Sequence, residues 1–445
     1  MKTEDIASVR LPETSRHGKH PSQQPIHHPV EKKMHTGLTA ILALEGRLRG
    51  DRVIWGLVAI LSMCSLLVVY SSTGSLAYRY AKSTEFYLFK QSAFIAVGLC
   101  IIYFAHLVDY RYYARLAVWA YIVSVPLLIY TLAFGSSIND ASRWIRLPII
   151  NLTFQTSDMA KLTLFMYLAR QLSRKQPVIR EWKKGFLPLI VPVAVTCLLI
   201  APENLSTALL VAATSLLLMF IGRAALRHIL LVAGVAVIPL SILVALAIHF
   251  YDPVSKASRD LPAVLSVKRV ETWIHRIQDF FYADAQDVSY QVQQANIAIA
   301  KGGWTGLGPG KSEARNFLPH PYSDFIYAIT IEEYGLLGAA ILPLVYLAFL
   351  FRCIRMFRRS PYAFGGFLAM GLGFTLAIQA LANMAVNVNL VPVTGVTLPL
   401  VSMGGSSFVF TCLSIGIILS VARELEDKER SQADQPSHLQ PSPDV

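Results

Sequence analysis

Charge is scarce in this 445-residue chain, because Asp, Glu, Lys and Arg together make up 15% of its residues. An ordinary soluble domain carries about 25%. Hydrophobic residues account for 54% of the chain, and they gather in long runs that hold almost no charge. Such a composition excludes both a soluble globular enzyme and a disordered chain. A polytopic membrane protein remains.

Cysteine and acidic residues are also few. The thiols lie far apart in apolar stretches without metal-ligand spacing, so we expect small buried side chains and neither a disulfide framework nor a metal site. They are Cys64, Cys100, Cys197, Cys353 and Cys412. The 28 Asp and Glu are outnumbered by 40 Lys and Arg, which gives a formal charge of +12. Basic cytoplasmic loops explain this excess in a membrane protein, so no nucleic-acid partner is expected.

The apolar stretches predict an all-α polytopic membrane protein with about ten transmembrane helices, since each crossing needs about 20 mainly apolar residues. The stretches lie near 53–71, 87–107, 112–134, 158–172, 186–201, 205–222, 226–249, 324–351, 363–387 and 404–422. Two features are marginal: 158–172 is short and contains Lys161, and only the polar residues 202–204 separate the fifth stretch from the sixth.

Basic residues orient these helices. The loops 170–185 and 352–362 hold six and four Lys or Arg, and both become cytoplasmic when the N-terminus is cytoplasmic. With ten spans, both termini lie inside. The predicted organisation is a disordered cytoplasmic tail at 1–52, a transmembrane domain at 53–422 and a second disordered tail at 423–445. No cleavable signal peptide is expected before the first span.

Three segments then face outward, at 135–157, 250–323 and 388–403. The second, between helices 7 and 8, is too long for a passive connector. It retains eight basic residues on the outer side, which points to an anionic ligand. They are Lys256, Arg259, Lys268, Arg269, Arg276, Lys301, Lys311 and Arg315.

Several outer residues are candidates for chemistry, each with a structural alternative. Lys161, one turn inside a span, needs a cavity or a partner. It can pair with Asp158 three residues earlier, either as a structural pair or within an anion site. Ser157 or Asp158 is also placed to cap the helix. Glycines at 302, 303, 306, 308 and 310 permit either close backbone approach to a ligand or a tight turn, and they do not form a Walker loop.

Asp324 lies at the membrane surface, where partial desolvation favours a general base, although Ser323 or Asp324 equally fits a helix N-cap. Glu332 and Glu333 lie two turns deeper and need partners, for which Lys161 is one candidate. Farther along, Gln379 and Asn383 precede the Pro-, Gly- and Ser-rich segment 392–407. That segment predicts either a polar groove between the last two spans or a simple re-entrant turn.

Four segments, in this order, resemble motifs of the SEDS family of cell-wall proteins, which includes FtsW, RodA and SpoVE. Residues 141–145 (Ala-Ser-Arg-Trp-Ile) match the outer-loop motif, and 154–161 resemble a segment ending in Gln-Pro-Ser-Glu-x-x-Lys. Residues 318–325 resemble Leu-Pro-Glu-x-x-Thr-Asp-Phe, and 392–407 resemble Pro-x-x-Gly-x-x-Leu-Pro-x-x-Ser-x-Gly-Gly-Ser-Ser. The resemblance covers about residues 50–422, in register with ten spans.

The resemblance implies a peptidoglycan glycosyltransferase that polymerises the lipid-linked precursor lipid II beside a class B penicillin-binding protein and other division proteins. By motif, Asp324 matches the family's essential aspartate and would be the catalytic acid or base. The substrate-binding residues expected at this site are Arg143, Trp144, Gln155, Lys161, Arg269, Lys311, Ser312 and Ser406. No cofactor is required by the sequence, and a divalent cation, Mg²⁺ or Mn²⁺, is left open.

The resemblance also implies a location and a type. The long N-terminal extension, and a segment 302–312 without the Gly-Thr-Gln ending of RodA, favour an FtsW-like division protein in the bacterial cytoplasmic membrane, at the septum. A lipid II flippase and a non-catalytic division scaffold are the alternatives. Transport is mildly disfavoured, because we find no inverted repeat and the ionisable groups crowd toward the outer face.

The chain departs from the family pattern at several positions. His320 stands in place of a Glu, Thr156 of a Pro, Asp158 of a Glu, Ser323 of a Thr, Asn389 of a Gly and Thr394 of a Lys. Asp158 and Ser323 keep the chemistry. His320 removes a carboxylate beside Asp324 and places there a group that titrates near neutrality.

Overall fold

The computed structural model describes residues 49–74, 76, 83–138, 141–146, 153–252, 257–258, 268–282, 290–319 and 321–433. Residues from Gly50 onward form one compact unit. The predicted tail at 1–52 lies outside the described residues up to position 48, and so do the last residues after 433 and His320.

The described residues are mainly helical. The long helices are α2 (Arg52–Ser72), α4 (Thr84–Leu107), α5 (Tyr110–Phe134), α6 (Thr156–Lys175), α7 (Leu187–Ile200), α8 (Leu205–Ile221), α9 (Leu226–His249), α12 (Ile326–Ala339), α13 (Ile341–Arg359), α14 (Ala363–Asn387) and α15 (Ser406–Ala433). Two further helices follow α9, α10 (Lys268–Tyr282) and α11 (Tyr290–Gly302). Short turns of helix lie at Gln176–Val178, Trp182–Phe186 and Ala314–Asn316.

The all-α membrane fold class is confirmed, whereas the count of ten spans is not. Every predicted stretch is mainly helical, but within the described residues seven helices are long and apolar enough to cross a membrane, or eight if the bent pair α12 and α13 is one span. The predicted spans that do not meet this criterion are α6 and α8, the two that were marginal in the sequence. α8 has 17 residues, and α6 carries charged residues at both ends.

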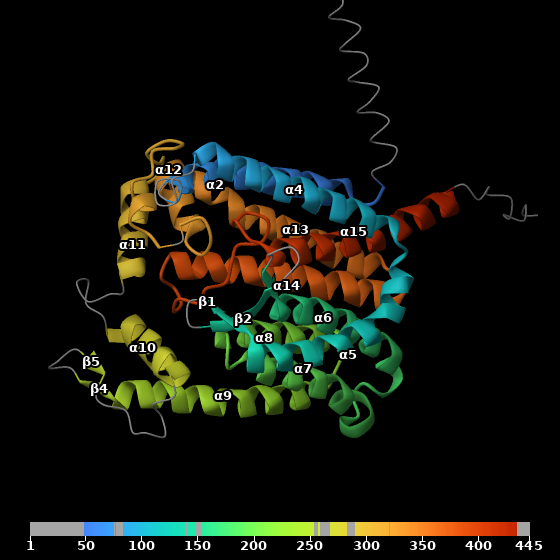
Figure 1. Cartoon of the computed structure of the whole chain (residues 1–445). Coiled ribbons are helices and arrows are strands. Elements are labelled where there is room, and N and C mark those ends of the chain that lie inside the picture. Colours follow the sequence, from blue (N-terminus) through green and yellow to red (C-terminus); the bar gives the residue numbers. More distant parts are fainter. Residues whose placement is uncertain are drawn as a thin grey trace, which may run out of the picture. The chain divides into compact units, whose positions relative to one another are not determined.

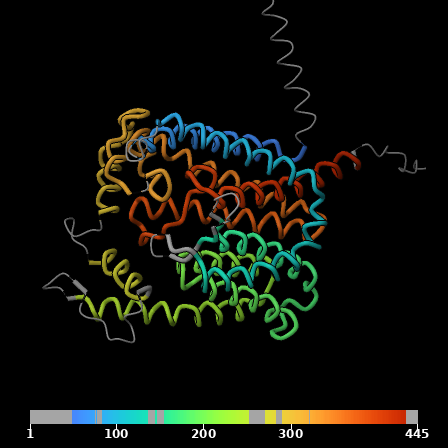
Figure 2. Tube along the Cα trace, in the orientation of Figure 1, coloured from blue at the N-terminus to red at the C-terminus, as the bar shows by residue number. Residues whose placement is uncertain are grey.

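The helices pack side by side, as Figures 1 and 2 show from one side. α2 and α4 lie along one edge, and α13, α14 and α15 run through the middle. α6 and α8 pack on the other side of α14, with α5, α7 and α9 outside them. Over an apolar stretch of 18 residues in each helix, 78% of the residues of α14 are buried but only 6% of those of α9. Glycines let neighbours approach α14 closely, because a Cβ on Gly373 would lie 2.6 Å from the Cys353 Sγ.

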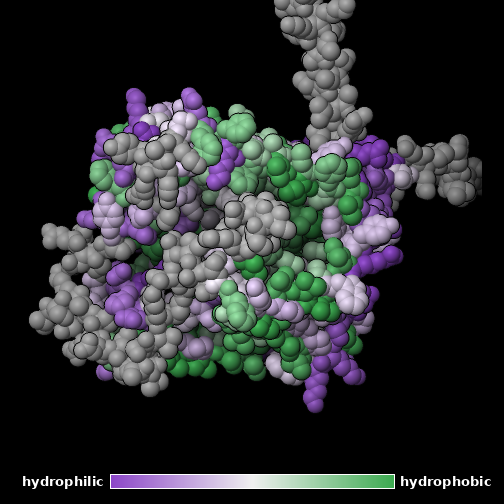
Figure 3. Space-filling model, in the orientation of Figure 1, coloured by the Kyte–Doolittle hydropathy of each residue, from purple (hydrophilic) through white to green (hydrophobic). Residues whose placement is uncertain are grey.

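Polar residues gather at the two ends of this bundle. Figure 3 shows hydrophobic residues over the middle of the visible face and hydrophilic residues at the end where α15 finishes. At this end, which we call the tail end, Arg352 pairs with Asp51 and Arg111 with Glu424. The second tail was predicted to begin at 423, but α15 continues to Ala433, with Arg430 bonded to Glu426 one turn away.

The opposite end carries the non-helical elements, and we call it the site end (Figure 1). Strands β1 (Ser136–Ile138), β2 (Ala141–Arg146) and β3 (Thr153–Gln155) form an antiparallel sheet in that order. A two-stranded ribbon, β4 (Tyr251–Asp252) with β5 (Ala257–Ser258), follows α9. The chain runs from β3 directly into α6, so the sheet fixes where α6 begins.

The predicted single span at 324–351 is broken, which corrects the sequence interpretation. α12 and α13 meet at an angle of 65°, and Gly335 interrupts α12 with a φ of 68°. The backbone of residues 303–308 runs against this break: the N–H groups of Leu307 and Gly308 donate to the carbonyls of Glu332 and Glu333, each at 2.9 Å. A Cβ at position 335 would overlap the Trp304 carbonyl, so glycine is required there.

Substitution of Gly335 therefore tests this packing. We expect Gly335→Ala to destabilise the fold by more than the about 1–2 kcal/mol that a left-handed residue costs by itself, because the added methyl also displaces the loop. Thermal unfolding in detergent measures the change. Gly234→Ala is the matched control, since a Cβ there meets nothing within 4 Å, and a Gly335→Ala protein as stable as this control would contradict the expectation.

Candidate functional site

Asp324 lies in the turn that leads into α12, and its side chain is partly exposed. The sequence left open whether Ser323 or Asp324 caps this helix. Neither does, since the N-cap is Phe325 and no side chain of the flanking turn makes a cap bond. The Asn387 Oδ1, on α14, accepts instead from the Ala328 N–H at 3.0 Å. The carboxylate of Asp324 is thus not used as a helix cap.

The immediate surroundings of that carboxylate are small and polar. The Ser323 hydroxyl donates to the Asp324 Oδ1 at 2.8 Å. On the other side lies Gly395, whose φ is 64° and where a Cβ would stand 3.7 Å from the Asp324 Oδ2. One carboxylate oxygen is thus held by a hydroxyl and the other faces a residue with no side chain.

Gly395 belongs to the irregular segment 392–405 between α14 and α15. Several of its carbonyls receive donors from neighbouring helices: the Gln379 Nε2 donates to Thr397 at 3.1 Å, the Ser65 hydroxyl to Val401 at 2.9 Å and the Tyr346 hydroxyl to Pro399. Irregular backbone at membrane depth is stable only when protein or water satisfies it in this way.

Lys161 connects α6 to the same segment. Its Nζ lies 2.7 Å from the Asp158 Oδ1 and 3.2 Å from the Gln379 Oε1, and Gln379 in turn holds Thr397. The predicted pairing of Asp158 with Lys161 is confirmed. The predicted cap is wrong, because Gln155 is the N-cap of α6 and makes no side-chain cap bond. Beside Lys161 lies a cavity of about 10 Å³, about the space of one water.

The sheet brings three further predicted residues together. Trp144 on β2 is paired with Gln155 on β3, and the Gln155 N–H donates to the Ser406 hydroxyl at 2.9 Å. Ser406 is the first residue of α15. Arg143 directly precedes Trp144 on β2, but its side chain lies outside the described residues.

The glycine-rich loop serves the fold in a way that the sequence did not reveal. Its Ser312 is buried, and the Ser312 hydroxyl donates to Glu332 while the Ser312 N–H donates to Glu333 at 3.2 Å. The Glu313 and Ala314 N–H groups also donate to Glu332, at 3.1 and 3.2 Å. The close backbone approach permitted by these glycines is therefore made to α12.

Lys161 was one candidate partner for the two buried glutamates, and that interpretation is wrong. Their carboxylates accept from the loop and from the Ser71 hydroxyl on α2, whose carbonyl is bound by the Arg315 Nη1 at 3.0 Å. Lys311, next to Ser312 in the chain, is exposed. Glu313, in the same loop, pairs with Lys301. The Lys301 ammonium lowers the pKa of the Glu313 carboxyl.

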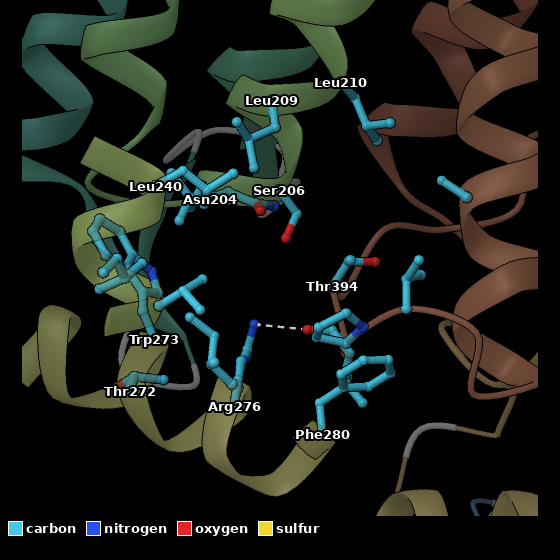
Figure 4. Close-up of a pocket in the computed structure, with 18 of the residues that line it drawn as sticks. Asn204, Ser206, Leu209, Leu210, Leu240, Thr272, Trp273, Arg276, Phe280 and Thr394 are labelled. Carbon is cyan, nitrogen blue, oxygen red and sulfur yellow. Dashed lines mark hydrogen bonds between the residues drawn. The ribbon is translucent and has the colours of Figure 1, made fainter. Parts of the chain in front are cut away.

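A large apolar cavity opens beside the segment that carries Gly395. Its volume is about 550 Å³, and it is lined by residues of α8, α9, α10, α14 and positions 391–394. Figure 4 shows Leu209, Leu240, Trp273 and Phe280 around the space, with Ser206 and Thr394 on its rim. The Thr394 Oγ1 is buried and has no hydrogen-bond partner among the described residues.

One basic residue stands in this cavity wall. The Arg276 Nη1, from α10, donates to the Val393 carbonyl at 3.2 Å, as the dashed line in Figure 4 marks. Arg269 lies one residue into the same helix, but its side chain lies outside the described residues. Within the described part of the chain, no three His, Cys, Asp or Glu side chains gather as a metal site would require.

Comparison with known proteins shows which family this chain resembles. The FtsW, RodA and SpoVE family, described as "Cell cycle protein", matches residues 51–427. The chain belongs to this family. A curated relative from Geobacter sp. (strain M18), named "Probable peptidoglycan glycosyltransferase FtsW", is 30% identical over 379 residues, which cover 84% of this chain and 97% of the relative.

Two solved structures share the fold of this chain. One comes from a study of a peptidoglycan synthase complex and its "structural coordination of polymerization and crosslinking", with a TM-score of 0.64 and 24% identity over 84% of this chain and 98% of that one. Another is the rod shape determining protein RodA of Thermus thermophilus, with a TM-score of 0.58 and 23% identity over 84% of this chain and 97% of that one.

Sequence reasoning missed three residues around Asp324. Asn387 and Ser402 hold the turn that contains Asp324, and Gly395 faces its carboxylate. A signal for Asn387 was present, because Gln379, Asn383 and Asn387 recur every four residues in an apolar helix and buried polar groups in a span need partners.

Proposed function

We propose that this chain is a peptidoglycan glycosyltransferase that polymerises lipid II into glycan strands at the outer face of the cytoplasmic membrane during cell division. The observation that carries the proposal is the juxtaposition of Asp324 and the apolar cavity. The carboxylate oxygen that Ser323 does not hold faces Gly395, and the preceding residue, Thr394, lines the 550 Å³ space. A polyprenyl-linked sugar needs both an apolar groove for its tail and a base at its headgroup.

The chemistry follows from inversion at one carbon. The 4-hydroxyl of the acceptor lipid II attacks the anomeric carbon of the donor strand, the new β-1,4 bond forms, and the bond to the polyprenyl pyrophosphate breaks. Asp324 accepts the hydroxyl proton, a role worth about 10²–10⁴-fold in rate. Ser323 holds one carboxylate oxygen, which leaves the other for the acceptor hydroxyl.

The departing pyrophosphate requires positive charge. We assign this role to Arg143, Arg269 and Lys311, with or without Mg²⁺ or Mn²⁺. Lys161 is already neutralised by Asp158 at 2.7 Å, so it binds substrate less directly and holds the segment beside Asp324 through Gln379. Trp144, Gln155 and Ser406 form the wall of the site between the sheet and α15.

The proposal includes an orientation and a partner. The site end of the transmembrane domain at 53–422 faces outward, and the tail end faces the cytoplasm. Both terminal tails are cytoplasmic, and the protein is located at the septum. A class B penicillin-binding protein is the proposed partner, together with other division proteins. The relatives named as FtsW glycosyltransferases and the fold shared with a chain of a peptidoglycan synthase complex support this assignment.

Strand synthesis by the purified wild-type protein tests the function. Incubation with lipid II, with and without a class B transpeptidase whose own active site is blocked, should give long glycan strands and free polyprenyl pyrophosphate. Movement of lipid II across a vesicle membrane without strands would favour a flippase. Neither activity, with the partner present, would favour a scaffold.

The cavity assignment makes a separate prediction. Leu243→Trp, on the α9 wall of the cavity, should raise the KM for lipid II at least about tenfold, because the larger ring fills the space of the lipid tail. The kcat should change little, since Asp324 is untouched. Leu230→Trp, on the exposed face of the same helix, is the control, and equal KM values for the two variants would contradict the cavity assignment.

A further inference from the structure

Three buried amides form a stripe on α14, which we call the amide stripe (Gln379, Asn383 and Asn387). They are spaced four residues apart and therefore share one helix face. Their exposed fractions are 7%, 1% and 1%. Buried amides in an apolar helix are stable only when their donors and acceptors are used, and all three are used at the Asp324 turn or the segment beside it.

Asn387 makes the most informative contacts. Its Nδ2 donates to the Asp324 carbonyl at 2.9 Å, and its Oδ1 accepts from the Ala328 N–H at 3.0 Å. These two backbone groups are four residues apart, so in a continuous α-helix they would bond to each other. The side-chain amide of Asn387 is inserted between them.

The insertion determines where α12 begins. Because the bond between the Asp324 carbonyl and the Ala328 N–H is replaced, the helix starts at Ile326. Phe325 has a φ of −105° and a ψ of 19°, which is not helical. Asp324 consequently stays outside the helix, with its carboxylate toward Gly395.

Asn383 reinforces this arrangement from one turn away. Its Nδ2 donates to the same Asp324 carbonyl at 2.9 Å and to the Val396 carbonyl at 2.7 Å. One amide group thus ties the turn that holds Asp324 to the segment that holds Gly395. Asn383 therefore helps to set the distance between the carboxylate and that segment.

The two preceding carbonyls are held as well. The Ser402 hydroxyl donates to the Ser323 carbonyl at 2.7 Å, and the Met403 N–H donates to the Tyr322 carbonyl at 2.9 Å. Three consecutive carbonyls before α12 are therefore bound by α14 and the segment that follows it. Such over-determination is expected where a reacting group must be placed to within a fraction of an ångström.

We infer that Asn387 and Asn383 are positioning residues for the proposed glycosyl transfer: their amides keep Asp324 out of α12 and fix its carboxylate against the 395–397 backbone. The inference rests on the proposed function. Neither amide touches substrate, so both act on turnover through Asp324. Loss of the Asn387 amide lets the Asp324 carbonyl bond to the Ala328 N–H, so that α12 extends by one residue to Phe325 and the Asp324 carboxylate moves.

The test uses Asn387→Leu, which has a similar branched shape and no amide, and Asn387→Asp, which keeps an acceptor for Ala328 but no donor for Asp324. Each full-length variant is assayed for glycan synthesis from lipid II in the presence of the blocked transpeptidase. The rate is expressed per molecule of protein that binds lipid II. We expect kcat to fall about 10- to 100-fold for both variants, with KM changed by less than about threefold.

Two more variants keep the test decisive. Ser402→Ala removes the hydrogen bond to the Ser323 carbonyl with a smaller change in the core, and it should also lower kcat. This variant replaces Asn387→Leu in the test if the latter does not fold. Gln176→Leu is the control, since the Gln176 amide also donates to two carbonyls, of Leu172 and Gly222, at the tail end. It should leave kcat unchanged.

The outcomes separate the two proposals. Wild-type protein that makes no strands would count against the function and not against the positioning. Wild-type strands together with Asn387→Leu, Asn387→Asp and Ser402→Ala variants that all turn over within threefold of wild type per folded molecule would overturn the positioning role and leave the function in place.

Discussion

Asp324→Asn should lower the rate of glycan polymerisation by about 10²–10⁴-fold, the usual contribution of a general base. The amide has nearly the same shape as the carboxylate and can still receive the Ser323 hydroxyl bond, but it cannot take a proton from the acceptor. Binding of lipid II should stay within about threefold of wild type, because the cavity that holds the tail is untouched. Initial rates and lipid II binding, measured on the same preparation, check both parts.

Two companion variants sharpen this result. Asp324→Glu keeps a carboxylate but moves it by one methylene, so we expect a smaller loss, of about 10- to 100-fold. Glu313→Gln removes an exposed carboxylate of the neighbouring loop and should leave the rate unchanged. Near-normal polymerisation by Asp324→Asn would remove Asp324 from the mechanism.

Lys161→Met should be the most destabilising of the substitutions considered. The Asp158 side chain is 5% exposed and lies 2.7 Å from the Lys161 ammonium, so removal of the cation leaves a buried carboxylate without its charge partner. Breaking one side of a buried ion pair costs about 3–5 kcal/mol. The free energy of unfolding in detergent, or the thermal midpoint, measures the loss.

The double variant decides the cause of that loss. Lys161→Met combined with Asp158→Asn removes both charges and should recover much of the stability, because no unpaired ion stays buried. Arg359→Met serves as the control. Its pair with Glu429 is exposed, and such surface pairs contribute about 0–1 kcal/mol. A single Lys161→Met variant as stable as the double variant would contradict this account of the pair.

Hydropathy predicted the membrane helices because burial in lipid imposes a simple requirement on composition. It could not predict the break at Gly335, since the break arises from contact with residues 303–308, far away in sequence. At Asn389, where the family has glycine, the φ is 56°. Asparagine is among the few residues that adopt this left-handed conformation readily, which explains how the substitution is accommodated.

The candidate site was partly predictable for similar reasons. The pair of Asp158 and Lys161 follows from their spacing on one helix. The partners of Glu332 and Glu333 do not, because they are hydroxyls and backbone N–H groups of a loop, and sequence carries no signal for backbone donors. The role of Asn387 required the structure, since it depends on which two backbone groups its amide separates.

Glycan polymerisation by wild type and Asp324→Ala, run side by side with the same blocked transpeptidase, tests the central claim most directly. The account predicts long strands from the wild type alone, because only its carboxylate can accept the proton of the acceptor hydroxyl. Equal strands from both proteins would contradict the assignment of Asp324 as the base, and no strands from either would contradict the assignment of a glycosyltransferase.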